Sequence, residues 1–260
     1  MSVPKRRAIR ARAACLTALS LAVLACAWPA LSAPSTASAP RGAGKGLYSD
    51  VAQCADLAAL KLVRLLPPPP GEGSPEERAE LDELLRLQAN RTAAQAERAR
   101  QDAEVSVFRF ANALGNPAGF TPANLPLTVR LFRRIDGDEA AVLGAAKHEF
   151  SRPRPFTVEP RLNPVIPRPA SSSYPSGHST WAYVTGLVLA DMIPERRAAI
   201  LARADEFAHN RSVAGVHYPS DVEAGRLAGT TLAAMLFACG PFEAEEAAAR
   251  AELRKALGLR

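Results

Sequence analysis

Two sequence patterns, the alternation typical of β-strands and the long apolar run typical of membrane spans, are nearly missing from the chain beyond its N-terminal region. Segments in which apolar and polar residues alternate, the pattern of a half-buried β-strand, hardly occur, and this absence excludes a fold built on sheets. Beyond the N-terminal region no apolar run is long enough to cross a membrane. The best candidate, residues 181–192, has the length of a buried core helix. The sequence therefore predicts an all-α protein, a single-domain helical bundle without stable membrane insertion.

The N-terminal residues are typical of an export signal rather than of a fold. Five basic residues between Lys5 and Arg12 precede an apolar stretch, residues 13–28, and small residues follow around Ala33. This is the layout of a secretory signal peptide, which we place at residues 1–33. A periplasmic or secreted protein is therefore expected.

The chain beyond the signal divides into two parts. Residues 34–46 are rich in alanine, proline, serine and glycine and predict a flexible lead-in. The folded domain is expected over residues 47–260. A lipoprotein anchored through Cys26 is the alternative to a cleaved, soluble product.

Most of the positive charge belongs to the signal peptide. The chain has 32 basic and 26 acidic residues, a net charge of +6. Residues 1–33 hold five of the basic residues and no acidic residue, which leaves 27 against 26, or +1. A nearly neutral mature chain lacks the basic surface that nucleic acids require, so nucleic-acid binding is not expected.

Cysteines are few, and signal cleavage removes two of the four. Cys54 and Cys239 remain, near the two ends of the mature chain. An even pair in an oxidising compartment favours a disulfide. Two separate buried thiols are the alternative that the sequence leaves open.

Helical patterns cover most of the mature chain. Residues 156–174 are proline-rich and irregular, which suits a loop leading into a site. The expected helices span residues 50–66, 75 to about 110 with a break near Asn90, 125–134, 139–150, 178–192, 195–210 and 220–238.

Three short polar segments hold the residues with the clearest chemical potential. They are KHEFSRPRP (147–155), YPSGHS (174–179) and NRSVAGVHYPSD (210–221). Together they supply a lysine, several arginines, a Ser-Gly pair, two histidines and an aspartate. This set suits one chemistry above others, in which a phosphoryl group is bound without a metal and transferred through a histidine.

The first segment offers cations. Lys147 lies near the end of an expected helix, and two Arg-Pro pairs follow, at Arg152 and Arg154. Lysine acts as a point charge, whereas arginine presents a planar fork that matches phosphate. A solvated basic helix end is the alternative, and the segment itself does not decide between the two arginines.

The second segment forms a turn that leads into a helix at His178. A helix N-terminus offers free N–H groups and the positive end of the helix dipole, which together bind anions. Gly177 permits close backbone approach, and the Ser176 hydroxyl can donate to a phosphate oxygen. An ordinary N-cap serine followed by an exposed histidine is the alternative.

The third segment contains Arg211, His217 and Asp221. His217 precedes an expected helix and Asp221 falls in its first turn, so the two can pair. A carboxylate on one ring nitrogen fixes the histidine tautomer and leaves the other nitrogen as a nucleophile. We expect Asp221 to raise the pKa of His217, and the cations to lower that of His178.

A metal centre is the competing hypothesis for these segments. Zinc or a two-metal site needs three or more His, Cys or carboxylate ligands, whereas the other conspicuous residues here are cations. The sequence therefore predicts no metal and no cofactor. The remaining histidines, His148 and His209, are expected to be surface or structural groups.

The three segments resemble the signature of the phosphatidic acid phosphatase type 2 superfamily, which vanadium haloperoxidases share. Within it, the sequence is most similar to the secreted bacterial class A non-specific acid phosphatases, also at residues 66–70, 102–106 and 173–180. The resemblance implies the all-α fold of that group, with residues 47–260 as the catalytic domain. It also implies a metal-independent phosphoric monoester hydrolase, an acid phosphatase that acts on small phosphomonoesters, releases inorganic phosphate and forms a phosphohistidine. Assembly into a homo-oligomer is left open.

The resemblance also assigns roles to individual residues. His178 becomes the general acid, His217 the nucleophile and Asp221 its orienting carboxylate. It favours Arg154 over Arg152 as a phosphate ligand. The implied phosphate ligands are Lys147, Arg154, Ser176, Gly177 and Arg211.

Two positions depart from the family pattern. Asn210 stands where a serine usually precedes the arginine, which puts one supporting hydrogen bond in doubt. Tyr218-Pro219 stands where Trp-Gln is often found, which leaves substrate preference open. The alternatives are a lipid phosphatase or a vanadate-dependent haloperoxidase that uses the same pocket, and a non-catalytic phosphate-binding module.

Overall fold

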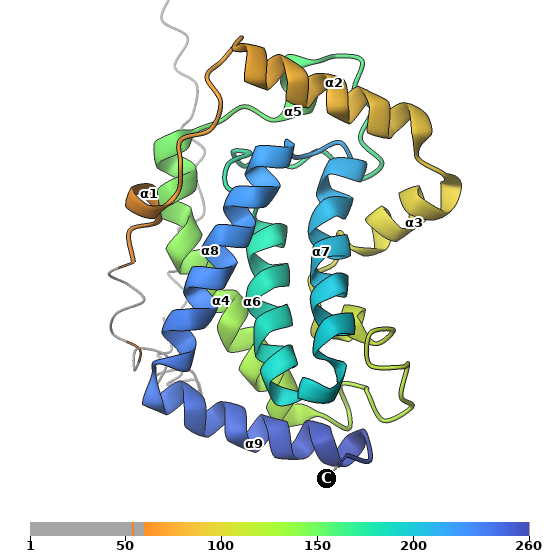
Figure 1. The fold of residues 1–260 in the computed structure, drawn as a ribbon, viewed down its shortest axis with the longest axis vertical. Coiled ribbons are helices and arrows are strands. Elements are labelled where there is room, and N and C mark those ends of the chain that lie inside the picture. Colours follow the sequence, from red (N-terminus) through yellow and green to blue (C-terminus); the bar gives the residue numbers. More distant parts are fainter. Residues whose placement is uncertain (1–53, 55–59, 260) are drawn as a thin grey trace, which may run out of the picture. The chain divides into compact units, whose positions relative to one another are not determined.

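Helices account for all regular secondary structure in the residues that the structure describes. The computed structural model describes residue 54 and residues 60–259, which lie within one compact unit, Lys45–Arg260 (Figure 1). No β-strand occurs among these residues, so the predicted all-α class is confirmed. The α-helices are α1 Leu62–Leu65, α2 Pro75–Asn90, α3 Ala93–Gln101, α4 Pro126–Phe150, α5 Pro155–Val158, α6 Gly177–Met192, α7 Arg197–Val213, α8 Pro219–Phe237 and α9 Gly240–Ala256.

A disulfide joins Cys54 to Cys239, with the two Cα atoms 5.8 Å apart. The predicted pairing is confirmed. The bond ties residue 54 to the junction of α8 and α9, 185 residues further along the chain. The predicted signal peptide (1–33), the lead-in (34–46) and Cys26 lie outside the described residues.

The helices α6, α7 and α8 run side by side at the centre of the fold (Figure 1). Two glycines on α8 allow its close approach to α6. A Cβ atom on Gly225 would lie 2.6 Å from the carbonyl oxygen of Ser176, and one on Gly229 would lie 2.3 Å from that of Thr180. Because both distances are far below van der Waals contact, the α6–α8 spacing requires glycine at these positions.

The central helix α6 is apolar over almost all of its surface. Val184, Val188 and Leu189 are fully buried in the largest hydrophobic cluster, so the expected core helix is confirmed. No single helix in the described part of the chain is long and apolar enough to cross a membrane; α8 and α9 meet that criterion only as a pair, bent by 94°.

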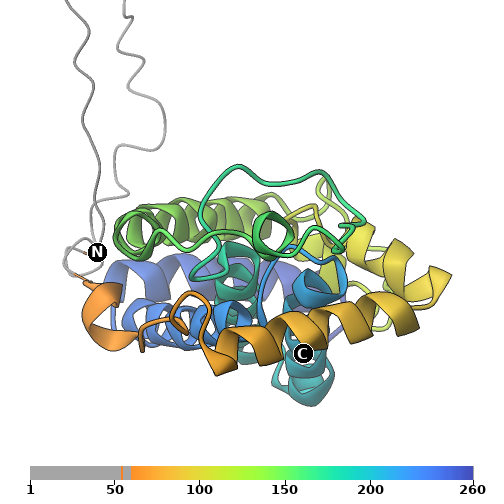
Figure 2. The same cartoon turned by 90° about the horizontal axis from the view of Figure 1, so that it is seen from above.

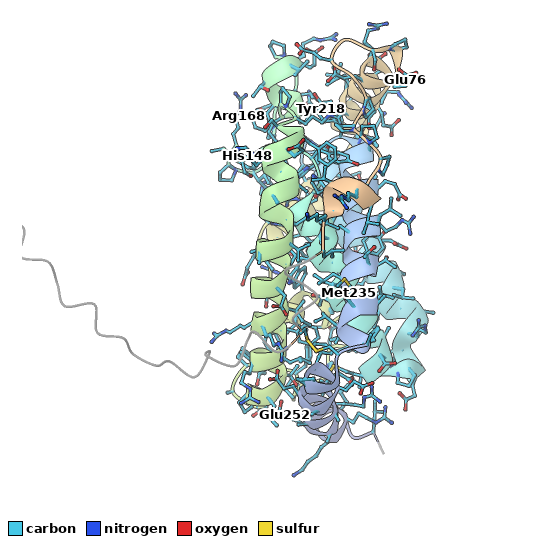
Figure 3. All side chains as sticks on the ribbon, turned by 90° about the vertical axis from the view of Figure 1, so that its left-hand side faces the viewer. Glu76, His148, Arg168, Tyr218, Met235 and Glu252 are labelled. Atoms are coloured by element: carbon cyan, nitrogen blue, oxygen red, sulfur yellow. A yellow bond between two sulfur atoms is a disulfide. The ribbon has the colours of Figure 1, made fainter. Side chains whose placement is uncertain are left out.

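Two long helices enclose the centre. Helix α4 packs against α6 and α9, and α9 crosses one end of the central helices (Figure 1). Glu252 of α9 caps the start of α4, because its carboxylate accepts hydrogen bonds from the backbone N–H groups of Leu127 (3.0 Å) and Thr128 (2.8 Å). Figure 3 shows Glu252 at this lower end of α4, opposite the end where Tyr218 lies.

Helix α4 is continuous where the sequence predicted two helices, 125–134 and 139–150. The expected break at residues 135–138 was wrong. The helix passes through Gly137, which costs it about 1 kcal/mol relative to alanine. Tertiary contacts offset this cost: the Trp181 Nε1–H donates to Asp136 Oδ1 at 2.7 Å, which anchors this turn to α6.

The helical stretch expected to reach Phe110 ends earlier. The predicted break near Asn90 is confirmed, since Thr92 and Gln95 form a capping box that starts α3. However, α3 stops at Gln101, and only a 3-10 turn, Val107–Phe110, follows. The helix ends where the Asp102 carboxylate binds buried partners on α7. No local sequence pattern indicates this long-range contact.

The C-terminal helix α9 was not predicted. It starts at a Gly-Pro pair, and its sequence is dominated by alanine and charged residues. Only Phe242, Ala249 and Leu253 bury apolar side chains, a stripe too sparse to stand out in the sequence. At the other end, the described part of the expected helix 50–66 contains one turn, α1.

The three central helices and α4 place termini at the same end of the fold. Helices α4 and α7 end there, and α6 and α8 begin there (Figure 1). Viewed onto this end, α2 and the segment between α5 and α6 lie over the helix termini (Figure 2). Two positive helix ends are thereby directed at the region where the three polar segments meet.

Candidate active site

The structure brings the predicted site residues together at this end. Lys147 lies in the last turn of α4, and its Nζ donates to Pro175 O, one residue before Ser176, at 2.7 Å. Ser176 N donates to Asp221 O at 3.0 Å, which joins the start of α6 to the first turn of α8. Arg154 reaches His217 from the N-terminal side of α5. Segments separated by up to 74 residues therefore form one cluster.

The geometry around His217 defines its tautomer. Arg154 Nη1 lies 2.7 Å from Nε2 of the ring, and Asp221 Oδ2 lies 3.3 Å from Nδ1. A guanidinium can only donate, so Nε2 must accept and carries the lone pair. The proton is then on Nδ1 and donates to Asp221. His217 is 2 % exposed, so Nε2 is held in a dry, oriented position.

Asp221 is fully buried and accepts hydrogen bonds from several donors. Besides His217, its carboxylate accepts from the hydroxyl of Ser173, from the backbone N–H of Tyr218 at 2.9 Å and from Arg152 Nη1 at 2.7 Å. Burial raises the pKa of Asp221, while Arg152 and these donors act in the opposite direction. Its orientation relative to His217 is therefore determined by three neighbours at once.

The two arginines of the first segment have different positions. Arg154 faces His217 and also donates to the carbonyl oxygens of Ser171 and Val216, both at 2.8 Å. Arg152 instead binds Asp221 and Glu80, each at 2.7 Å, and lies over the ring of Tyr218. Arg152 thus supports the carboxylate, and Arg154 is placed to meet a ligand. The choice implied by the family resemblance agrees with this placement.

The expectation that Asp221 raises the pKa of His217 was wrong in direction. Complete burial lowers the pKa of His217 well below its usual range, and Arg154 and Lys147 lower it further. Burial costs the imidazolium its hydration, and the cations repel it. His217 therefore remains neutral, the state in which Nε2 keeps its lone pair.

His178 is the second residue of α6, and its ring binds the protein through Nε2 instead of Nδ1. Its Nε2 lies 3.1 Å from the carbonyl oxygen of Ala103, which can only accept, so Nε2 carries a proton. Nδ1 is the nitrogen left to exchange a proton with a ligand. Burial, followed by Arg211, lowers the pKa of His178 to about 3, so the predicted direction of this shift is confirmed.

Ser176 is the N-cap of α6, as the plainer interpretation of this segment predicted. Its Oγ accepts from the backbone N–H of Ser179 at 3.3 Å, and the residue is fully buried. The next residue, Gly177, is the first of the helix, where backbone N–H groups have no acceptor within the helix. The cap and the anion-binding terminus belong to the same turn.

The cations retain donors for an anion. Lys147 uses two of its three N–H groups on the carbonyl oxygens of Ser172 and Pro175, and burial, followed by Arg154, lowers its pKa to about 8. Arg211 is 2 % exposed, yet its Nε is buried without a hydrogen-bond partner among the described residues. Burial, followed by Arg154, lowers the pKa of Arg211 to about 10. A phosphoryl group would satisfy such donors and offset their mutual repulsion.

One acidic residue near this cluster was missed by the sequence interpretation. Glu139 lies in the middle of α4, and its Oε1 would be 3.4 Å from a Cβ atom on Gly177. This oxygen is buried without a hydrogen-bond partner in the described part of the chain. Burial raises the pKa of Glu139 to about 8, against the effect of Lys147. Glu139 precedes the first polar segment and belongs to no recognisable motif, so only the packing of α4 on α6 reveals it.

The other two histidines are exposed, as predicted. His148 lies on the outer side of α4 (Figure 3), and His209 lies on the surface of α7. In residues 54 and 60–259 no group of three or more His, Cys, Asp or Glu side chains is placed to hold a metal ion. The ionisable side chains among the predicted site residues are thus two histidines, one carboxylate and three cations.

Comparisons with known proteins identify relatives over most of this chain. A family model described as the PAP2 superfamily matches residues 139–244. A non-specific acid phosphatase of Salmonella typhimurium is 32% identical over 199 residues, which cover 72% of this chain and 78% of that protein. A non-specific acid phosphatase of Providencia stuartii is 28% identical over 244 residues, which cover 88% and 96%.

A solved structure has the same fold. A bacterial vanadium-dependent iodoperoxidase superposes with a TM-score of 0.53 at 20% identity, over 67% of this chain and 52% of that protein. This chain thus matches about half the length of the peroxidase, and the likeness concerns the fold alone. The residues that match the family model include all eight site residues described above. The chain belongs to the PAP2 superfamily and, within it, to the non-specific acid phosphatases.

Proposed function

We propose that this protein is a secreted acid phosphatase that hydrolyses phosphate monoesters without a metal, through a phosphohistidine at Nε2 of His217. The observation that carries the proposal is the pair of contacts on the His217 ring. Arg154 at Nε2 and Asp221 at Nδ1 orient a neutral imidazole with its lone pair toward the cations of the site. The acid phosphatases among its relatives support the same reaction class.

In the first step, the Arg154 N–H that donates to Nε2 turns to an oxygen of the bound phosphate. The freed Nε2 lone pair attacks phosphorus, and the bond between phosphorus and the ester oxygen breaks. The negative charge of a bound phosphate ester offsets the cations that lower the pKa of His178, so it favours the doubly protonated ring. His178 then gives its Nδ1 proton to the departing alcohol, so the leaving group is neutral. Lys147, Arg154, Arg211 and the N-terminus of α6 bind the equatorial oxygens, whose charge is spread in the loose transition state.

In the second step, water attacks the phosphohistidine. His178, now neutral, takes a proton from the water as the N–P bond breaks, and inorganic phosphate leaves. Asp221 stabilises the positive charge on His217 while the ring is phosphorylated, because its carboxylate accepts a hydrogen bond from Nδ1–H throughout. Together the two steps consume only the phosphate ester and one water molecule, and they release the alcohol and inorganic phosphate.

Export is part of this proposal. Disulfides persist in oxidising compartments and are rare in the cytosol, so the Cys54–Cys239 bond supports a periplasmic or secreted protein. The N-terminal sequence of the mature protein tests the point directly. A start between residues 34 and 40 is expected; an acylated Cys26 would instead establish the lipoprotein.

The covalent intermediate gives the decisive experiment. Purified protein is mixed with an aryl phosphate, quenched in alkali and digested, and a phosphohistidine is sought by mass spectrometry at residue 217. His217→Ala should abolish both the adduct and turnover. His148→Ala is the matched control, because it makes the same chemical change at an exposed histidine of α4. An adduct on any other residue would refute the assignment of the nucleophile.

Metal independence is tested on the same protein. Hydrolysis should survive excess EDTA, and vanadate should inhibit it as a mimic of the trigonal-bipyramidal transition state. Loss of activity on chelation and its return with a divalent metal would contradict the mechanism. Aryl, alkyl and lipid phosphates compared side by side, with peroxidase activity assayed on vanadate-loaded protein, separate this function from the two alternatives within the superfamily.

A further inference from the structure

The side chain of Asp102 forms a buried junction beside the site. The residue follows α3 and is 0 % exposed. One of its carboxylate oxygens is bound by the guanidinium of Arg203, and the other accepts from Asn210 Nδ2 at 2.7 Å. Arg203 and Asn210 are seven residues apart on α7, which places them on the same face of that helix. The carboxylate is thus held by two turns of one helix.

The backbone at Asp102 faces the reacting groups. The carbonyl oxygen of Asp102 lies 3.4 Å from Arg211 Nη1, and that of Ala103 lies 3.1 Å from His178 Nε2. Two successive peptide groups therefore contact a cation of the phosphate site and the histidine that protonates the leaving group. The backbone N–H groups of residues 102–104 still donate to carbonyl oxygens of α3, so the backbone ties this turn to α3. The Asp102 side chain adds the contacts that tie the same turn to α7.

We propose that Asp102 is a positioning residue for the phosphatase reaction. Held by Arg203 and Asn210, it presents the Ala103 carbonyl to Nε2 of His178 and the Asp102 carbonyl to Arg211, so that Nδ1 of His178 is the nitrogen available for proton transfer. The proposal rests on the function proposed above. It also assigns a task to Asn210, one of the two positions at which this chain departs from the family pattern.

The energetics favour a positional role for this junction. A buried ion pair contributes little net stability compared with apolar residues of the same size, because both charges lose their hydration. Its geometric specificity is high, since both carboxylate oxygens have defined partners. The Ala103 carbonyl has a further effect: its hydrogen bond raises the pKa of His178 against the lowering by burial and cations. Displacement of this carbonyl would leave less of His178 protonated and free its Nε2 from a single tautomer.

The test compares Asn210→Ala and Asp102→Asn with the native protein on two substrates. An alkyl phosphate needs its leaving group protonated, whereas p-nitrophenyl phosphate does not. We expect both variants to lose about tenfold more kcat/KM on the alkyl ester than on the aryl ester, a part of the 10²–10⁴ that general acid catalysis supplies. Inhibition by inorganic phosphate should weaken as well, because Arg211 loses its fixed neighbour.

Glu252→Gln is the control for a purely structural effect. It replaces one of the two acceptor oxygens of the cap at the distal end of α4 with an NH₂ group, which cannot accept. It should lower the unfolding temperature without changing the ratio of the two substrates. If Asp102→Asn does not fold, Asn210→Ala alone decides, since it deletes one hydrogen bond and no charge. A substrate ratio within twofold of the native value in a folded Asn210→Ala protein would overturn the proposal.

Nuclear magnetic resonance provides a readout that needs no substrate. The ¹⁵N shifts of His178 should report an Nε2-protonated ring in the native protein and a mixture of tautomers in Asn210→Ala. An unchanged tautomer in that variant would also overturn the positioning role. A native protein that hydrolyses no phosphomonoester, but shows the expected tautomer change, would refute the proposed function and leave the positioning of His178 in place.

Discussion

Arg154 Nη1 lies 2.7 Å from Nε2 of His217, on the opposite side of the ring from Asp221. Because arginine has no acceptor, this contact assigns the lone pair to Nε2 and the proton to Nδ1. Asp221 is fixed in turn by Arg152, Ser173 and the backbone of Tyr218. The orientation of the His217 ring thus depends on a chain of contacts that starts at Glu80, the second partner of Arg152.

Asp221→Asn should impair the first chemical step. The amide can present its NH₂ group to Nδ1, which would place the imidazole proton on Nε2 and remove the lone pair. We expect kcat to fall by about 10²–10⁴-fold, with a smaller change in KM because the phosphate ligands remain. Rapid-quench measurement of the phosphohistidine should show a slower rise. A normal rise with slow breakdown would contradict the role assigned to Asp221.

His178→Ala should distinguish substrates by their leaving groups. Loss of the proton donor should lower kcat by about 10²–10⁴-fold for an alkyl phosphate, and by far less for an aryl phosphate whose leaving group needs little protonation. A phosphohistidine should therefore still form from the aryl ester. Equal losses on both substrates would mean that His178 does not act as the acid.

The pH dependence of stability should report Glu139. Its folded-state pKa is raised to about 8, from an ordinary value of 4.5. Between these values the unfolded chain releases the proton while the folded protein keeps it, so stability falls as pH rises through this window. Glu139→Gln stays neutral at every pH and should remove this loss.

The measurement is urea unfolding of both proteins at pH 4 and at pH 8.5. From pH 4 to pH 8.5, the free energy of unfolding of the variant should rise by roughly 2–4 kcal/mol relative to that of the native protein. A fully buried group would contribute ~1.4 kcal/mol for each unit of its pKa shift, and the expected change is smaller because Glu139 is partly exposed. A constant difference at both pH values would show that Glu139 titrates normally.

Gly229→Ala should disturb the contact of α8 with α6. The added Cβ would lie 2.3 Å from the carbonyl oxygen of Thr180, backbone that cannot move aside cheaply. A loss of about 1–3 kcal/mol or more is expected in urea unfolding. Gly144→Ala on α4 is the matched control, since nothing lies within 4 Å of its Cβ; it should gain about 0.5–1 kcal/mol. Similar effects of the two substitutions would contradict the close packing of α6 and α8.

Removal of the disulfide should cost stability but not activity. The Cys54–Cys239 bond closes a loop across 185 residues, so Cys54→Ser/Cys239→Ser should lose about 2–5 kcal/mol in urea. Cys239 follows the far end of α8, whose 19 residues span ~28 Å from the active-site end, so kcat at 25 °C should remain within about twofold. Equal unfolding midpoints with and without reductant would refute a stabilising bond.

Features that depend on neighbours along the chain were accessible from the sequence. His217 and Asp221 are four residues apart across a helix start, and Ser176, Gly177 and His178 are consecutive at another. Such spacings determine local geometry, because one or two helical turns bring the side chains together. The all-α class was predicted because segments in which apolar and polar residues alternate are nearly absent.

Features that depend on contacts between distant elements were decided only by the tertiary structure. Neither the task of Arg152, nor the end of α3 at Asp102, nor the burial of Glu139 has a local signature. The pKa of His217 shows why: its adjacent carboxylate pointed to a raised value, yet burial and cations from α4, α7 and the segment before α5 lower it. Desolvation is a sum over everything packed around a group, and that packing exists only once the helices have assembled.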